Sequence, residues 1–175
     1  KTRIKSWWYI FWPRNARKLY QLSLPIIYNK NLLANPGFEE GSGSEPDGWQ
    51  KRSAVWAQDE VRSGQYSFSL IPDSENGWNV FNSRERLPVM QDTTYRLSWW
   101  AKLGSDEDSA SIGIRETDDD LEWKHFTNQS GWTRYEMEFT PTDPTTKYIQ
   151  VFGYIGRNNS EPVWYDDFRF EIIED

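Results

Sequence analysis

The fold is decided by the stretch NLLANPGFEEG (residues 31–41) together with a distant counterpart, VWYDDFRF (residues 163–170). The first leads from an apolar pair into an Asn-Pro-Gly turn, and the second flanks two adjacent carboxylates with alternating aromatic residues. Both read as strands with acid at one end. If they pair, Glu39 and Asp166 meet in the folded chain. Two carboxylates held together require a cation or a shared proton, and a calcium ion is the simplest candidate.

From Asn31 onward the sequence alternates apolar and polar residues, and turn residues interrupt the pattern at short intervals. About ten short strands with almost no helical period are typical of a sandwich or jelly roll. The predicted strands cover residues 54–61, 66–71, 78–81, 86–90, 94–103, 111–116, 123–126, 132–140, 147–155 and 163–173, and the predicted loops include 40–49, 105–109 and 118–120. The sequence therefore predicts an all-β jelly-roll sandwich of two antiparallel sheets over residues 31–175.

Five motifs occur in order: NLLANPGFEEG, PDGW (46–49), RSGQYSFSL (62–70), TTYRLSWWAK (93–102) and VWYDDFRF. In this order and spacing they resemble the carbohydrate-binding modules of the galactose-binding-like jelly-roll type, which are appended to xylanases, cellulases and laminarinases. The resemblance covers roughly residues 31–174. It implies a non-catalytic module that binds a polysaccharide or an oligosaccharide.

The resemblance also implies a structural calcium ion (Ca2+) between the first strand, the Ser-Gly turn and the last strand. Glu39 and Asp166 then supply carboxylate ligands, and Ser63 and Gln65 offer side-chain or carbonyl oxygens. Asp166 shares strand parity with Trp164 and Phe168, which predicts that it points inward and that Asp167 faces solvent. In the alternative interpretation, Glu39 and Asp166 cap loops or pair with Arg62.

Side chains whose neighbours are buried must point outward, and this rule predicts which residues lie on the outer faces of the sheets. The resemblance implies that one such face binds a sugar. In modules of this kind the sugar lies across one sheet, where rings stack on pyranose faces and Arg, Gln or Asn bind hydroxyls. The candidate ligand residues are Arg96 and Trp100 on one strand, Arg115 on another, Tyr154 if Val151 and Gly153 point inward, and Trp56, Trp78 and Trp123 as walls. The alternative for any single tryptophan is core packing.

The composition narrows the function further. Aromatic residues make up 17% of the 175 residues, more than a core of this size needs, and there is no cysteine. Residues 1–30 carry seven basic residues and no acid, whereas the remaining 13 basic and 27 acidic residues give −14. A body this acidic argues against nucleic acid as a partner, because phosphate binding needs basic surface. No run approaches the roughly 20 apolar residues of a spanning helix.

Residues 1–30 are predicted to form a basic aromatic arm or linker. It packs on a neighbouring domain or subunit, docks on a membrane surface, or adds a strand or helix to the module.

Catalysis finds little support, since His125 is the only histidine and no Gly-x-Ser-x-Gly motif is present. We therefore expect a non-catalytic carbohydrate-binding module of a larger extracellular or cell-surface protein. The alternative is a structural or protein-interaction subunit of the same fold, whose arm docks on partner chains or a membrane.

Overall fold

The computed structural model describes residues 30–52, 54–72, 79–116, 119–127, 130–156 and 158–173. Residues 1–29 of the predicted arm, and Trp78, lie outside this part of the chain, so their roles stay predictions. The described residues form thirteen strands and no helix. They accordingly contain no helix of the length and apolarity needed to cross a membrane.

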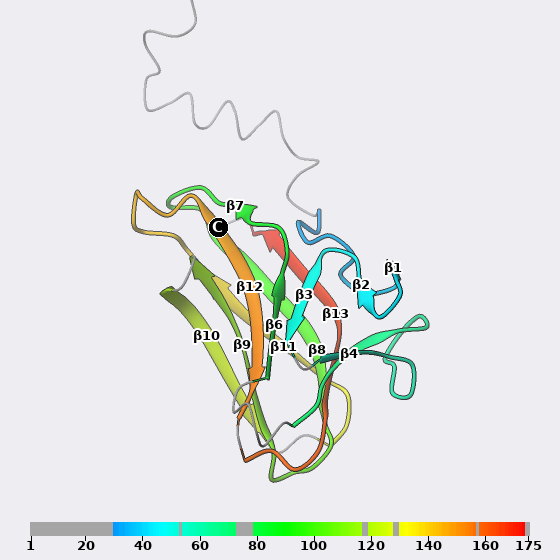
Figure 1. The fold of residues 1–175 in the computed structure, drawn as a ribbon. Helices are drawn as coiled ribbons and strands as arrows, with labels where there is room; N and C mark the ends of the chain where they lie inside the picture. The colour runs from blue at the N-terminus through cyan, green and yellow to red at the C-terminus, as the bar shows by residue number, and fades with distance from the viewer. Residues whose placement is uncertain are drawn as a thin grey trace, which may run out of the picture.

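Two antiparallel sheets form the body of the protein (Figure 1). The six-stranded sheet has the order β10 (Asp119–Thr127), β9 (Ser109–Glu116), β12 (Tyr148–Ile155), β6 (Asn79–Ser83) and β3 (Trp49–Arg52), with β7 (Leu87–Pro88) also paired to β12. The five-stranded sheet has the order β11 (Thr133–Phe139), β8 (Tyr95–Leu103), β13 (Val163–Ile172), β5 (Ser67–Leu70) and β4 (Ala54–Ala57). A small hairpin joins β1 (Gly41–Ser42) to β2 (Glu45–Pro46). The predicted all-β jelly-roll sandwich is confirmed.

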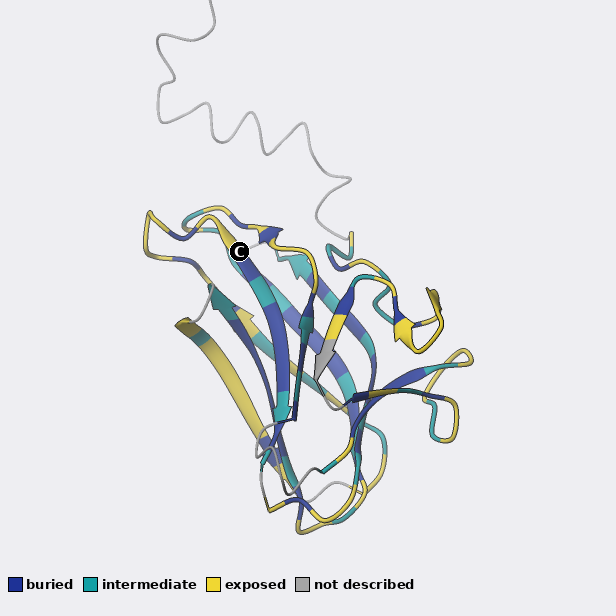
Figure 2. Ribbon diagram, viewed as in Figure 1, coloured by how far each residue is buried: buried dark blue, intermediate teal, exposed yellow. Residues whose placement is uncertain are grey.

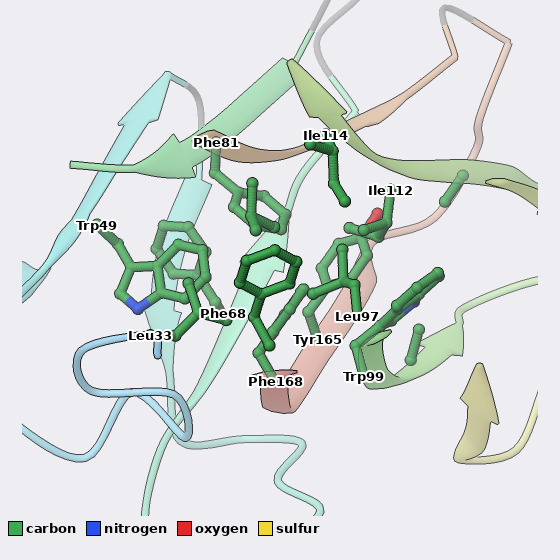
Figure 3. Packing of buried hydrophobic residues seen from close by; sticks show 14 of the residues in the cluster. Leu33, Trp49, Phe68, Phe81, Leu97, Trp99, Ile112, Ile114, Tyr165 and Phe168 are labelled. Carbon is green, nitrogen blue, oxygen red and sulfur yellow. The ribbon is translucent and has the colours of Figure 1, made fainter. Parts of the chain in front are cut away.

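The core lies between the two sheets and is rich in aromatic rings (Figure 3). Inward-facing residues of the long central strands fill it, such as Leu97 and Trp99 of β8 and Ile112 of β9. Phe38 packs against Phe68 with ring centroids 5.1 Å apart and against Trp49 at 5.0 Å. Close ring packing of this kind stabilises a sandwich whose strands are short.

The stretch 31–38 runs beside β13, but it is not the predicted strand. The Leu32 amide donates to the Phe170 carbonyl at 2.7 Å, and the Phe168 amide donates to the Pro36 carbonyl at 2.9 Å. Pro36 has no amide hydrogen, and Asn35 and Phe38 have positive φ angles of 44° and 60°, which interrupt an extended ladder. The stretch therefore pairs with β13 through isolated hydrogen bonds.

Other predicted boundaries also change. The predicted loop 40–49 contains β1 and β2 and ends in the first residue of β3. The predicted acidic loop 118–120 includes the first two residues of β10, which begins at Asp119 and not at Trp123. Figure 2 shows β10 mostly exposed at the edge of its sheet, so few of its residues carry an alternating burial signal.

A β-bulge in β13 changes which side chains face the core. Asp166 is opposite Trp100 and Arg169 is opposite Ser98, so two residues of β13 face one residue of β8 between these pairs. Asp167, inside the bulge, has a φ of 49°. Asp166 is therefore on the outer side of the sheet with Trp164, whereas Phe168 points into the core. The prediction that Asp166 points inward with Phe168 is therefore wrong, although its side chain is buried.

Candidate functional site

Asp166 is wholly buried, although it lies on the outer side of its sheet, because the turn at residues 62–66 covers it. Its Oδ2 accepts hydrogen bonds from the backbone amides of Arg62 and Ser63, both at 3.1 Å, and its Oδ1 accepts from the Asp167 amide at 2.7 Å. Burial and the neighbouring Asp167 charge raise the pKa of Asp166 to about 6.

Glu39 contacts the other end of the same turn. Its Oε2 accepts from the Gln65 amide at 2.9 Å and its Oε1 accepts from the Tyr66 amide at 3.2 Å. The structure therefore brings the four predicted metal ligands, Glu39, Ser63, Gln65 and Asp166, to one turn. The alternative interpretation is also partly observed, because both carboxylates cap backbone amides there.

The carboxylates that could bind a cation lie around Gly37. A methyl group built at Gly37 would be 3.5 Å from Asp167 Oδ1, 3.7 Å from Asp166 Oδ1 and 3.9 Å from the Glu39 Cγ. Arg62 forms an ion pair with Asp167, which also accepts from the Ser63 hydroxyl at 2.8 Å. Within the described residues, no group of three or more Asp, Glu or His side chains is arranged to hold a metal ion. Calcium also accepts carbonyl and water oxygens, so a site here would have to draw on these beside Glu39 and Asp166, and the calcium ion stays a prediction.

A second candidate site is the outer face of the six-stranded sheet. Strand register aligns Trp123 of β10, Gly113 of β9, Phe152 of β12, Asn82 of β6 and Gln50 of β3 in one row. Four strand spacings make this row about 19 Å long. Trp123 is 53% exposed, and it is the large aromatic side chain that this row presents to solvent.

Gly113 permits close packing in the middle of this row. A Cβ atom there would be 2.7 Å from the Phe152 ring and 2.8 Å from the Glu122 carbonyl oxygen. Phe152 therefore lies low on the sheet, parallel to Tyr154 with an interplanar angle of 6°, and the Arg115 guanidinium is 5.3 Å from its ring centroid. Phe152 is thus packed between Gly113, Tyr154 and Arg115 in the middle of this row.

Polar side chains follow the same face. Asn82 Nδ2 donates to Gln50 Oε1 at 3.2 Å, and Gln150 Nε2 donates to the Ser83 carbonyl at 2.8 Å. His125 lies two residues after Trp123 on the same face of β10, and its Nδ1 is 3.1 Å from the Ser111 hydroxyl. This face thus presents an exposed indole, amide groups, an arginine and a histidine.

The predicted ligand face is only partly right in its geometry. Arg115, Trp123 and Tyr154 share the outer face of the six-stranded sheet, but Arg96 and Trp100 belong to β8 and lie on the outer face of the opposite sheet. There Arg96 pairs with Glu138 at 3.2 Å, and the Arg62 guanidinium lies 4.0 Å from the Trp100 ring centroid. The prediction that all these residues share one face is wrong.

Trp56 lies in neither group. It is on β4, at the edge of the five-stranded sheet, where its ring stacks on Tyr66. The sequence interpretation gave His125 little weight as a functional residue and missed Gln50, Asn82 and Gln150. The alternating pattern of β3, β6 and β12 could have predicted that these amides face outward, because each is next to a buried apolar residue.

Comparison with known proteins places these observations in a family. Residues 30–160 match the family described as carbohydrate binding domain. A comparison with curated protein sequences gives no match.

Several solved structures share the fold. TmCBM61, solved in complex with β-1,4-galactotriose, has a TM-score of 0.60 and 16% identity over 82% of this chain and 99% of its own. The Stig cyclase Fisc from Fischerella sp. TAU has a TM-score of 0.64 and 13% identity over 82% of this chain and 98% of its own.

The arabinose-bound MgGH51 α-L-arabinofuranosidase has a TM-score of 0.66 and 16% identity over 83% of this chain. This chain spans only 27% of that enzyme's length. The structural likenesses establish the fold, and the family match covers most of the chain. The chain belongs to the carbohydrate binding domain family.

Proposed function

We propose that the outer face of the six-stranded sheet binds a polysaccharide or an oligosaccharide. The observation that carries this proposal is the exposed Trp123 ring, aligned across the sheet with Asn82 and Gln50. A row of about 19 Å is long enough for several sugar units. It matches the class of ligand that the family binds.

Each group on this face has a distinct role in binding. The Trp123 ring stacks on the apolar face of a pyranose, and the amides of Gln50, Asn82 and Gln150 exchange hydrogen bonds with hydroxyl groups. The Arg115 guanidinium lies over the Phe152 ring on the same face, and its terminal NH2 groups would donate to a ligand oxygen, since its Nε is buried.

We expect Trp123→Ala to weaken glycan binding about tenfold to a hundredfold, because it removes the stacking surface, which contributes about 1.4–2.7 kcal/mol. The side chain is half exposed, so Tm should stay close to that of the unmodified protein. Affinity electrophoresis against β-glucans, xylan and mannan will identify the ligand, and titration calorimetry will measure the change.

Trp100→Ala is the matched control, since it removes an indole from the opposite sheet. It should lower Tm, because the Arg62 guanidinium packs on this ring, and it should leave glycan affinity unchanged. Equal glycan affinity of Trp123→Ala and the unmodified protein would assign binding elsewhere. Silence across the whole glycan panel would favour a structural or interaction subunit.

We also propose that the module is not an enzyme. The one histidine, His125, contacts Ser111, but Ser111 is wholly buried and cannot reach a substrate carbon. The cyclase with the same fold has only 13% identity, so its activity does not transfer. Chromogenic glycoside and ester substrates should show no turnover.

A structural calcium ion at Glu39 and Asp166 completes the proposed function. It would join the first stretch, the 62–66 turn and β13 by neutralising carboxylates that are otherwise held by backbone amides. Polysaccharides surround cells, so we propose that the module serves a larger extracellular or cell-surface protein. Antibody labelling of intact cells would check this location.

A further inference from the structure

A surface depression of about 350 Å3 opens at the edge of the five-stranded sheet, away from the Trp123 face. Its lining comes from the β1–β2 hairpin, from β4 and from the segment between β4 and β5. The hairpin and the β4 segment project from the same side of the sandwich (Figure 1). Its six lining residues are Gly43, Ser44, Val55, Trp56, Gln58 and Tyr66. This volume is near the lower end of the range for small-molecule pockets.

Two stacked rings form one wall of the depression. The centroids of Trp56 and Tyr66 are 4.1 Å apart, and the rings are inclined by 24°. The Trp56 indole donates to the Phe38 carbonyl at 2.6 Å, and the Tyr66 amide donates to Glu39 Oε1 at 3.2 Å. The Trp56 ring is therefore held by its own hydrogen bond, and the Tyr66 ring stacks on it from an anchored backbone, which lowers the entropy cost of binding.

The lining chemistry favours a neutral, partly apolar ligand. None of the six lining residues carries a charge at neutral pH, and Gln58 adds an amide to the aromatic wall. A sugar has the same mixture of apolar ring faces and hydroxyl groups. A protein partner would need roughly 800 Å2 of surface on each side, which a depression of this size does not provide.

We propose that this depression is a second carbohydrate site, which takes one or two sugar units independently of the Trp123 face. Trp56 and Trp123 belong to different sheets, so both sites can be occupied on one molecule. Two weak sites on one module would raise the affinity for long or branched polysaccharides through effective concentration.

The test uses the full chain labelled with 15N and titrated with cellobiose, xylobiose, β-1,4-mannobiose and β-1,4-galactobiose. Concentrations up to about 20 mM suffice for the weak binding expected of so small a site. We expect at least one disaccharide to shift the Trp56 indole resonance to saturation. That resonance is assigned by its loss in Trp56→Phe.

Two variants address the depression. Tyr66→Ala removes a wall ring and keeps the amide that Glu39 accepts, and Gln58→Ala changes an exposed loop residue with little risk to folding. Each should raise the Kd measured from the Trp56 shift at least fivefold. Trp123→Ala should leave this Kd unchanged. Tyr148→Ala, which removes an exposed aromatic ring elsewhere, is the matched control and should also leave it unchanged.

The second site is overturned if no disaccharide shifts the Trp56 resonance, if Gln58→Ala and Tyr66→Ala both bind as the unmodified protein does, or if Trp123→Ala abolishes the shift. If disaccharides shift the Trp56 resonance but Trp123→Ala changes the affinity for no glycan, the site in the depression is supported and the site on the Trp123 face is refuted. The two proposals therefore fail separately.

Discussion

Gly64→Ala is expected to lower the free energy of unfolding by about 2–3 kcal/mol, which corresponds to a fall in Tm of about 5–10 °C for a domain of this size. Gly64 has a φ of +69°, where an alanine is strained by about 1–2 kcal/mol. Its Cβ would also be 2.2 Å from Glu39 Oε1, so the carboxylate must move and release the Gln65 and Tyr66 amides. Thermal and urea unfolding will measure the loss.

Gly43→Ala separates the two causes. Gly43 has a nearly equal φ of +66°, but nothing lies within 4 Å of the position that an added Cβ atom would take. It should therefore cost only the backbone strain, about 1–2 kcal/mol. The difference between the variants measures the Glu39 contact. If both variants lose the same stability, Glu39 does not stabilise the 62–66 turn.

The sequence predicted those strands whose two faces differ in polarity. β8 follows its predicted bounds within one residue, because alternate side chains enter the core. β10 has an almost wholly exposed side-chain pattern, so alternation could not reveal its first residues. The stretch 31–38 reads as a strand, yet positive φ angles at Asn35 and Phe38 break it. The Asn35 side chain donates to the carbonyls of Glu40 and Asp47, contacts that local alternation does not reveal.

The candidate sites were predictable to different degrees. The meeting of Glu39 and Asp166 was predicted from pairing of the first and last segments, and both carboxylates contact the 62–66 turn in the structure. Local alternation predicts that Arg96 and Arg115 point outward, but it does not determine which sheet each strand joins. Sheet order depends on pairing between distant strands, so these two residues were wrongly expected on one face.

Without a bound metal, Asp166 should make the protein less stable as pH rises from about 4 to 6. Its pKa is about 6 in the folded chain and about 3.9 when unfolded, so the folded state holds the proton more tightly. The unfolded state binds fewer protons in this window, and the contribution to stability falls by about 3 kcal/mol. The Lys102 hydrogen bond lowers the pKa of Glu60, so ionisation of Glu60 stabilises the folded state as pH rises. This opposite effect occurs at lower pH than the effect of Asp166.

Calcium should reverse this penalty, because it binds the deprotonated carboxylate. At a concentration a thousand times its Kd it adds about 4 kcal/mol, or about 10 °C in Tm. We therefore expect calcium to raise Tm over the EDTA value strongly at pH 7.5 and little at pH 4.5. Calorimetry with 1 mM calcium chloride, about a thousandfold above a micromolar Kd, will measure both differences.

Two variants decide whether this response belongs to the 62–66 turn. Asp166→Asn should abolish the calcium response at pH 7.5, whatever its own Tm, because the amide removes the buried negative charge. Asp108→Asn is the matched control: Asp108 is also buried and accepts backbone amides from Ser160 and Glu161, but it lies in another loop. It should keep the calcium response. A calcium response that survives in Asp166→Asn would place the ion elsewhere. Equal Tm in calcium and EDTA at pH 7.5 would contradict the calcium site, and backbone amides and Arg62 alone would then hold the carboxylates.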